Sequence, residues 1–256
     1  MLVGYVDELK VYRGDDFSIS PHIKIHQATL GEICDYGEIA YYNMVLLLTA
    51  TPQSLKAELD EVDVDYTQIT PYELFYLMIY KIFDKEKTQI IFGDLDFSKF
   101  ELDMYDDGSV YLKQIIKVVE GKTIKEETII IDENVYNTFV AYLCVSHGIE
   151  RDETLPLNEA TKKILIEDAK EEKLINANKP QKSQLKNLIS SMINSEGFKY
   201  NHAEVWDMKI GAFMDSVKRI QKIKSADLIL QSGYSGFGIN LQEIDKKNLD
   251  WLGELD

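Results

Sequence analysis

The chain has 256 residues, 45% of them hydrophobic, and it carries 44 acidic against 28 basic side chains, a formal net charge of −16 at pH 7. This length and composition suffice for the core of one large domain or two small ones. The acidic balance argues against non-specific binding of nucleic acid, because phosphate contacts need Lys and Arg clustered over a wide face.

The N-terminal segment predicts two short strands followed by a helix. Apolar residues alternate with polar ones at Phe17 to Ile19 and at Ile23 to Ile25, which is typical of strands. Thr29 and Glu32 are three residues apart, as in a reciprocal helix cap. Apolar residues then recur at helical spacing as far as Leu48, so we expect one continuous helix.

A second helix begins at Thr70, where Pro71 and Glu73 add a first-turn proline and a capping acid. The residues from Leu74 to Ile82 leave little polar face, so we expect this helix to be buried. The acidic run from Glu58 to Asp65 before it lacks the glycine and the closing glutamate of a calcium-binding EF-hand loop and is predicted to be solvated.

The pattern changes to strands between residues 88 and 131. Asp106, Asp107 and Gly108 predict a tight hairpin turn, and Gly121 predicts a second turn. Asp132 then caps a helix that ends near Gly148. The predicted strands are Gln89 to Phe92, Phe97 to Asp103, Val110 to Ile116 and Thr128 to Ile131.

The remainder of the chain predicts helices only. A charged helix ends near Leu174, and the segment from Asn176 to Pro180 looks like a linker. Asn201 and Glu204 predict the cap of a further helix, and Ser225 the cap of a short one. We therefore expect an α+β fold that is mostly helical, with a small antiparallel sheet in an α+β domain at residues 1–150 and a helical region at residues 151–256 that includes a glycine hinge and an acidic C-terminal arm.

The charge balance reverses towards the C-terminus. Residues 180–224 contain eight basic and four acidic side chains, a local balance of +4, whereas residues 225–256 contain two basic and six acidic ones, a balance of −4. A small basic helical region thus lies between two acidic ones. It is too mixed in sign to bind nucleic acid.

No catalytic, cofactor-binding or metal-binding constellation emerges from the sequence, so we predict a protein that is not an enzyme. His22 and His26 are four residues apart, but no further zinc ligands accompany them in a recognisable pattern. Asp94 and Asp96 flank Leu95 after a glycine, and two carboxylates two residues apart on a strand can share a metal ion, which leaves a metal-dependent enzyme as a lesser alternative.

Two further features concern the compartment. Cys34 and Cys144 fall in apolar helical patterns and are predicted to be reduced core residues, as in a cytosolic protein. The first residues lack the pattern of a signal peptide, and no apolar run approaches the roughly 18 residues of a membrane span. We expect no membrane contact.

The best functional candidates are aromatic and apolar residues of the C-terminal region. A helical stripe that begins at Trp206 is compatible with a core role or an interface role. The segment from Gly233 to Gly238 matches neither a phosphate-binding loop nor a serine elbow, and predicts a hinge. The tail beyond it can bury its apolar side against its own domain or in a partner's groove. The predicted partner-binding residues are Trp206, Phe213, Tyr234, Phe237, Trp251, Leu252 and Leu255.

Several segments resemble a known group of proteins. They are the run IKIHQATLGEI at residues 23–33, the helix start TPYELFYLM at residues 70–78, the phrase FGDLDF at residues 92–97, and residues 206–230. Together they are similar to proteins of tailed phages and prophages of Gram-positive bacteria, in the tail-morphogenesis group that includes tail assembly chaperones and baseplate hub assembly proteins. Tail chaperones are usually shorter and more helical, and the strand-rich residues 88–131 depart from their pattern.

The resemblance implies a non-enzymatic protein that binds a tape measure or a baseplate hub component during assembly. It places the protein in the host cytoplasm, or with the virion if the protein stays in the particle. A permanent structural subunit of the tail or baseplate is the alternative, and homo-oligomerisation is compatible with either role.

Overall fold

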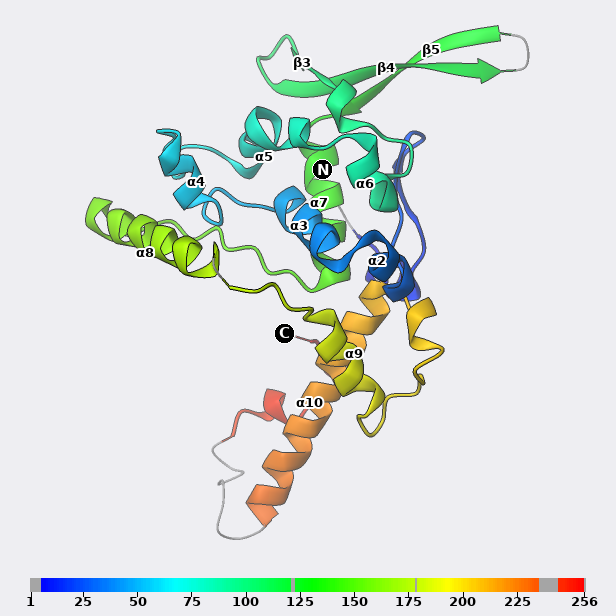
Figure 1. Ribbon diagram of the computed structural model, residues 1–256, viewed down its shortest axis with the longest axis vertical. Helices are drawn as coiled ribbons and strands as arrows, with labels where there is room; N and C mark the ends of the chain where they lie inside the picture. Colours follow the sequence, from blue (N-terminus) through cyan, green and yellow to red (C-terminus); the bar gives the residue numbers. More distant parts are fainter. Residues whose placement is uncertain (1–5, 121–122, 178, 235–243, 256) are drawn as a thin grey trace.

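The computed structural model describes residues 6–120, 123–177, 179–234 and 244–255. Helix α7 (Glu133–His147) runs through the centre of the body, and a three-stranded sheet lies at one end. Two helices, α8 (Glu159–Ala177) and α10 (Ile210–Tyr234), extend away from the body (Figure 1). The combination of many helices with small antiparallel sheets confirms the predicted α+β class.

Helix α7 is the centre of an aromatic core. It begins after Asp132, whose carboxylate accepts a hydrogen bond from the amide of Val135 at 2.8 Å, as the sequence predicts. Tyr136 and Phe139 of α7 pack against Phe75, with ring centroids 4.9 and 5.6 Å apart. These large buried rings tie α7 to the neighbouring helix.

The N-terminal elements lie beside α7 and α6. They are α1 (Glu8–Arg13) and the hairpin of β1 (Phe17–Ser20) and β2 (Ile23–Ile25), which confirms the two predicted strands. The capping box of Thr29 and Glu32 is also confirmed. The prediction of one continuous helix is wrong, because Gly37, at φ 103° and ψ 110°, separates α2 (Leu30–Tyr36) from α3 (Glu38–Leu48).

The next helices keep the predicted start but differ in burial. After α4 (Lys56–Glu61), the capping box of Thr70 and Glu73 opens α5 (Pro71–Leu74), which continues as a π-helical turn (Phe75–Ile79) and a 3₁₀ turn (Tyr80–Ile82). Leu77 and Ile82 are 59% and 48% exposed. The expectation of a buried helix is therefore wrong on one side, because this segment covers the body and turns only its Phe75 side inward.

One of the predicted strands is helical, and another is a strand only in its second half. Gln89 to Phe92 belongs to α6 (Lys85–Phe92), because Asp84 accepts a hydrogen bond from the amide of Lys87 at 3.0 Å and starts a helix there. The start of the next predicted strand is a 3₁₀ turn (Phe97–Lys99).

The main sheet has the antiparallel order β3 (Glu101–Met104), β4 (Val110–Glu120) and β5 (Thr123–Ile131). The predicted hairpin turn is confirmed, with Gly108 at φ 87°. The second turn, predicted at Gly121, lies outside the described residues. The far part of the β4–β5 hairpin extends past β3 (Figure 1) and exposes Ile115 and Val119.

The C-terminal half is helical, as predicted, with α9 (Leu185–Ile193), a 3₁₀ turn (Val205–Asp207), α10 and a last 3₁₀ turn (Lys246–Asn248). Helix α10 begins only at Ile210 and not near Asn201. The reason is tertiary, since the amide of Leu30 donates to the carbonyl of Met208 and the amide of Ile210 donates to that of Ala28, each at 3.0 Å. Helix α10 also passes through Ser225 without a break.

The hydrophobic core is continuous across residue 150. One cluster of buried side chains combines Ile189 of α9 and Phe213 of α10 with Phe75 and the residues around α7. The boundary between residues 1–150 and 151–256 stays a prediction.

The cysteines and the helix lengths can be compared with the predictions of two core thiols and of no membrane span. Both thiols are free, but Cys34 is exposed and Cys144 is half-buried. The core assignment is wrong for Cys34, because Leu30 and Ile33 form the buried side of α2. None of the described helices is long and apolar enough to span a bilayer.

Candidate protein-interaction site

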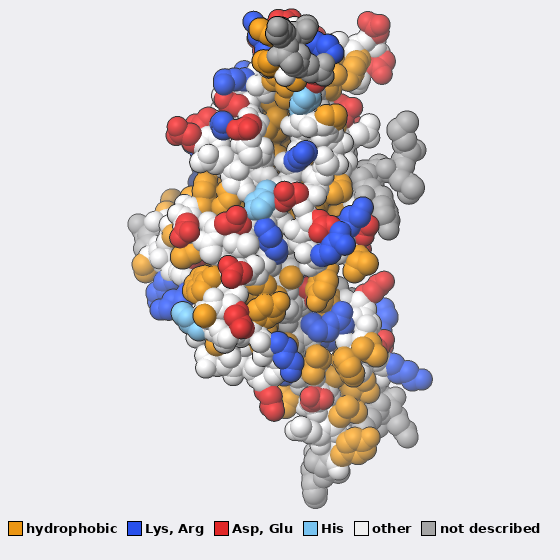
Figure 2. All heavy atoms as spheres, turned by 90° about the vertical axis from the view of Figure 1, so that its right-hand side faces the viewer, with side chains coloured by type: hydrophobic (Ala, Val, Ile, Leu, Met, Phe, Trp, Pro, Cys, Tyr) orange, Lys and Arg blue, Asp and Glu red, His pale blue; other side chains and the backbone are white. Residues whose placement is uncertain are grey.

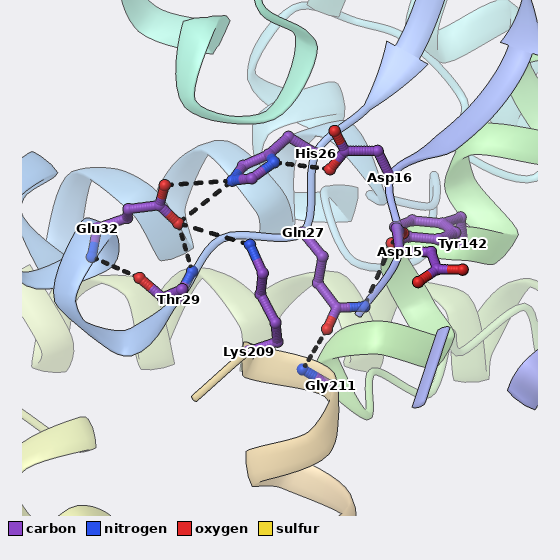
Figure 3. A network of polar contacts seen from close by, with 9 residues as sticks. All are labelled: Asp15, Asp16, His26, Gln27, Thr29, Glu32, Tyr142, Lys209 and Gly211. Atoms are coloured by element: carbon purple, nitrogen blue, oxygen red, sulfur yellow. Dashed lines mark hydrogen bonds and ion pairs between the residues drawn. The ribbon is translucent and has the colours of Figure 1, made fainter. Parts of the chain in front are cut away.

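The entry of the chain into α10 is fixed by a buried glutamine. The side-chain amide nitrogen of Gln27 donates to the carbonyl of Val11 at 2.9 Å and to the hydroxyl of Tyr142 at 3.2 Å, while its oxygen accepts from the amide of Gly211 at 3.2 Å. Figure 3 shows Gln27 between Tyr142 and the first turn of α10. A Cβ atom at residue 211 would lie 3.0 Å from the Gln27 oxygen, so glycine permits this approach.

A second layer of polar contacts covers this junction. The ring nitrogens of His26 face the carboxylates of Asp16 at 2.7 Å and Glu32 at 3.2 Å (Figure 3). Burial acts to raise the pKa of Glu32, but hydrogen bonds from the Thr29 amide and from His26 outweigh it, so the pKa lies below its ordinary value. Lys209, 4.0 Å from Glu32, precedes α10. Together these contacts set the direction in which α10 leaves the body.

Helix α10 forms a stalk with a buried base and an exposed end. Its base packs against α7 and α1, and Phe213 there is fully buried. Its last residue, Tyr234, is 81% exposed. Figure 2 shows hydrophobic side chains on the surface of the lower part of the molecule, where α10 lies. With 25 residues at about 1.5 Å rise each, the two ends of the helix are far apart.

The C-terminal arm, residues 244–255, lies along α10 and is held mainly by its backbone. The Nη1 atom of Arg219 donates to the carbonyl oxygens of Trp251 at 2.6 Å and Gly253 at 2.9 Å, and Lys222 donates to that of Glu254. Because these bonds use carbonyl groups, they do not engage the side chains of Trp251 and Leu252. Trp251 is 48% exposed and Leu252 is 75% exposed.

A cavity of about 730 Å³ opens beneath the arm, between α1, α7 and α10. Leu252 and Leu255 line it together with Met214 and Asp215 of α10. Burial raises the pKa of Asp215, although the nearby charge of Arg219 opposes this. The arm thus forms one wall of a cleft that is part apolar and part charged.

The structure does not bring the seven predicted partner-binding residues to one surface. Trp206 lies near the base of the stalk, edge-on to His202 with ring centroids 6.0 Å apart, in a groove of about 460 Å³ beside α9. Phe213 belongs to the core and offers no surface to a partner. Tyr234 is at the end of α10, and Phe237 lies outside the described residues. Trp251, Leu252 and Leu255 lie together on the arm.

Sequence reasoning did not single out Arg219 and Lys222, which hold the arm. Two basic residues three apart on a helix, followed by an acidic tail, are the signal that points to them. The glycine hinge is described only at Gly233, which is helical as the second-last residue of α10.

The two carboxylates considered as a metal site, Asp94 and Asp96, each pair with a lysine. Asp94 and Asp96 lie in the loop after α6 and not on a strand. Asp94 pairs with Lys85 at 2.6 Å, and Asp96 caps a 3₁₀ turn through Ser98 and pairs with Lys99 at 3.2 Å. The described residues contain no group of three or more His, Cys, Asp or Glu that could hold a metal ion.

Fold and site together define an α+β protein whose helical C-terminal module presents apolar side chains on an arm anchored by its backbone. Residues 177–256, which contain α9, α10 and the arm, match the family model of the YomV second domain. That family is associated with phages and prophages of Bacillus, so over this module the chain is similar to a phage protein. Comparisons with curated proteins and with solved structures find no match.

Proposed function

We propose that the protein is a non-enzymatic binding factor in the assembly of a phage tail or baseplate. In this proposal its C-terminal arm contacts a tail protein, either a tape measure or a component of the baseplate hub. The match of the module to a phage-associated family supports the phage context. The resemblance of the other segments to tail-morphogenesis proteins supports a role in assembly of the tail or baseplate.

The arm carries the proposal. Its carbonyl groups bind Arg219 and Lys222, whereas Trp251 and Leu252 remain exposed beside an open cleft. Trp is one of the residues that contribute most to protein interfaces, because a large apolar surface is buried at small cost in conformational entropy. The arm can therefore present its apolar side chains without leaving α10.

Co-purification with candidate tape measure and baseplate hub proteins of the same phage or prophage genome tests the proposal. We expect deletion of residues 233–256 to abolish binding, and Trp251→Ser with Leu252→Ser to weaken it by roughly tenfold or more, the effect of losing one or two central apolar contacts. Leu77→Ser with Ile82→Ser, an exposed pair elsewhere, is the control and should leave binding unchanged. If the deletion leaves each partner bound, the arm is not the contact.

Mass spectrometry of purified particles separates a transient factor from the structural alternative. We expect the protein to be depleted from finished particles. A fixed copy number per particle would identify a permanent subunit of the virion instead.

A further inference from the structure

Helix α8 is held to the body by charge. It packs against α4, as Figure 1 shows, and only Ile166 of its side chains is buried. Its inner face carries three lysines, and each forms an ion pair with the acidic run at residues 58–65. The pairs are Lys162 with Asp65 at 2.6 Å, Lys170 with Asp60 at 2.6 Å, and Lys173 with Glu58 at 3.2 Å and Glu61 at 2.9 Å. Four carboxylates of the acidic run are therefore paired, but they stay partly exposed to solvent, as the sequence predicts, and Glu58 to Glu61 belong to α4 instead of a loop.

The outer face of α8 has a different composition. Ile164, Asp168, Glu171 and Ile175 follow each other at helical spacings of four, three and four residues, which places them on one face opposite the lysines. Ile164 and Ile175 are 60% and 53% exposed. Glu172 lies beside this row. We call these five residues the outer face of α8.

The outer face has no ion-pair partner among the described residues. In the part of the chain that the structure describes, no ion pair involves Asp168, Glu171 or Glu172. The lysines nearest in the sequence, Lys170 and Lys173, point to the body and are paired there. Isoleucines exposed on a projecting helix, beside unpaired carboxylates, form a surface that is complementary to apolar and basic side chains.

The same negative charges disfavour a dimer in which the outer faces of two α8 helices contact each other. A symmetric contact would bring the three carboxylates of one copy against those of the other, and like charges across an interface oppose association. A helix with an apolar stripe flanked by Lys or Arg matches both features of the outer face.

We propose that the outer face of α8 docks an amphipathic helix of a partner protein whose apolar stripe is flanked by basic residues. This contact is separate from the C-terminal arm and does not rest on the function proposed for the arm. It gives the protein two docking surfaces, on two different projections of the fold (Figure 1).

A binding assay with the full-length protein and two synthetic peptides tests this proposal. Both peptides are fluorescently labelled helices with leucine at heptad positions a and d, one with lysine and the other with glutamate at positions e and g. We expect the lysine peptide to bind more tightly than the glutamate peptide by roughly tenfold or more, and the difference to shrink as salt is raised.

Variants of α8 locate the site. We expect Ile164→Ser with Ile175→Ser to weaken binding of the lysine peptide at least about tenfold. Asp168→Asn, Glu171→Gln and Glu172→Gln together should remove most of the difference between the two peptides. Circular dichroism checks that the helix content is unchanged.

Ile115→Ser with Val119→Ser, an exposed apolar pair on β4, is the matched control and should bind like the natural sequence. The proposal is overturned if neither peptide binds, if the α8 variants bind as well as the natural sequence, or if the control pair weakens binding equally. Deletion of residues 233–256 should leave peptide binding intact, so failure here and failure of the arm proposal are distinguishable.

Discussion

At the scale of single residues, His147 links two helices of the core. It lies in the last turn of α7, where its Nδ1–H donates to the carbonyl of Leu143 at 2.8 Å and its Nε2 accepts from the hydroxyl of Tyr41 in α3 at 2.8 Å. Burial lowers the pKa of His147 to about 4, although the hydrogen bond to Leu143 opposes this. The imidazole is therefore neutral in the folded protein at pH 7.

The lowered pKa of His147 predicts that the free energy of unfolding decreases in mild acid. Its pKa is lower in the folded chain than in the unfolded one, so the unfolded chain binds more protons between about pH 6.5 and pH 4. The stabilising contribution is complete above about pH 6.5 and falls by at most roughly 3 kcal/mol as the pH drops to about 4. Urea titrations at pH 7.5 and pH 5 measure the difference.

The control for this prediction is His147→Gln, which cannot take up the proton. We expect this variant to be less stable at pH 7.5 but to lose less stability than the natural sequence between the two pH values. An equal loss in both proteins would assign the acid sensitivity to other groups.

At the scale of elements, α8 differs from the other long helices in how it is attached. Helix α7 is held by buried aromatic rings and the base of α10 by Phe213, whereas α8 is held chiefly by the ion pairs of Lys162, Lys170 and Lys173. Exposed ion pairs contribute little each and weaken with salt. Helix α8 should therefore open more readily than the rest of the body.

Lys162→Gln, Lys170→Gln and Lys173→Gln in one protein test this attachment. We expect the amides of α8 to exchange with solvent deuterium roughly fivefold faster or more, because helices held by few apolar contacts open locally. The amides of α7 should keep their protection. About 1 M NaCl should produce a similar change in the natural sequence, and protection that survives both changes would mean that Ile166 and its neighbours suffice.

At the scale of the whole molecule, the C-terminal module depends on the body. Ile189 and Phe213 are buried in the same cluster as Phe75, and the junction through Gln27 joins α10 to elements far away in the sequence. A module separated from the body would expose these side chains to water. We therefore expect the fold to unfold as one unit, although the family match covers only residues 177–256.

This continuity predicts a single cooperative unfolding transition. We expect thermal unfolding followed by far-ultraviolet circular dichroism and by tryptophan fluorescence to give the same midpoint. Trp206 and Trp251 both belong to the module, whereas the described strands and helices α1 to α7 belong to the body. Expressed alone, residues 177–256 should lack a cooperative transition. Two separate midpoints, or a fragment that unfolds cooperatively, would show that the module is an independent domain.

Local signals in the sequence were sufficient to predict where many of the helices and turns begin. The caps at Thr29, Thr70 and Asp132 and the turn at Gly108 rest on contacts between residues at most three apart in the chain. Composition and hydrophobic spacing likewise gave the α+β class and the helical C-terminal half. The aromatic tail was recognised as a candidate contact for the same reason, because Trp and Leu within an acidic segment are visible in the sequence without a fold.

Contacts between distant residues decided the rest. Pairing of Met208 and Lys209 with the segment at residues 28–30 moves the start of α10 to Ile210. Only the fold could bring Arg219 under the carbonyls of the arm and α4 against the lysines of α8. The sequence by itself determined which segments can be helices or strands and which side chains are apolar. The tertiary structure determined which of those side chains remain exposed for a partner, because exposure depends on what packs beside them.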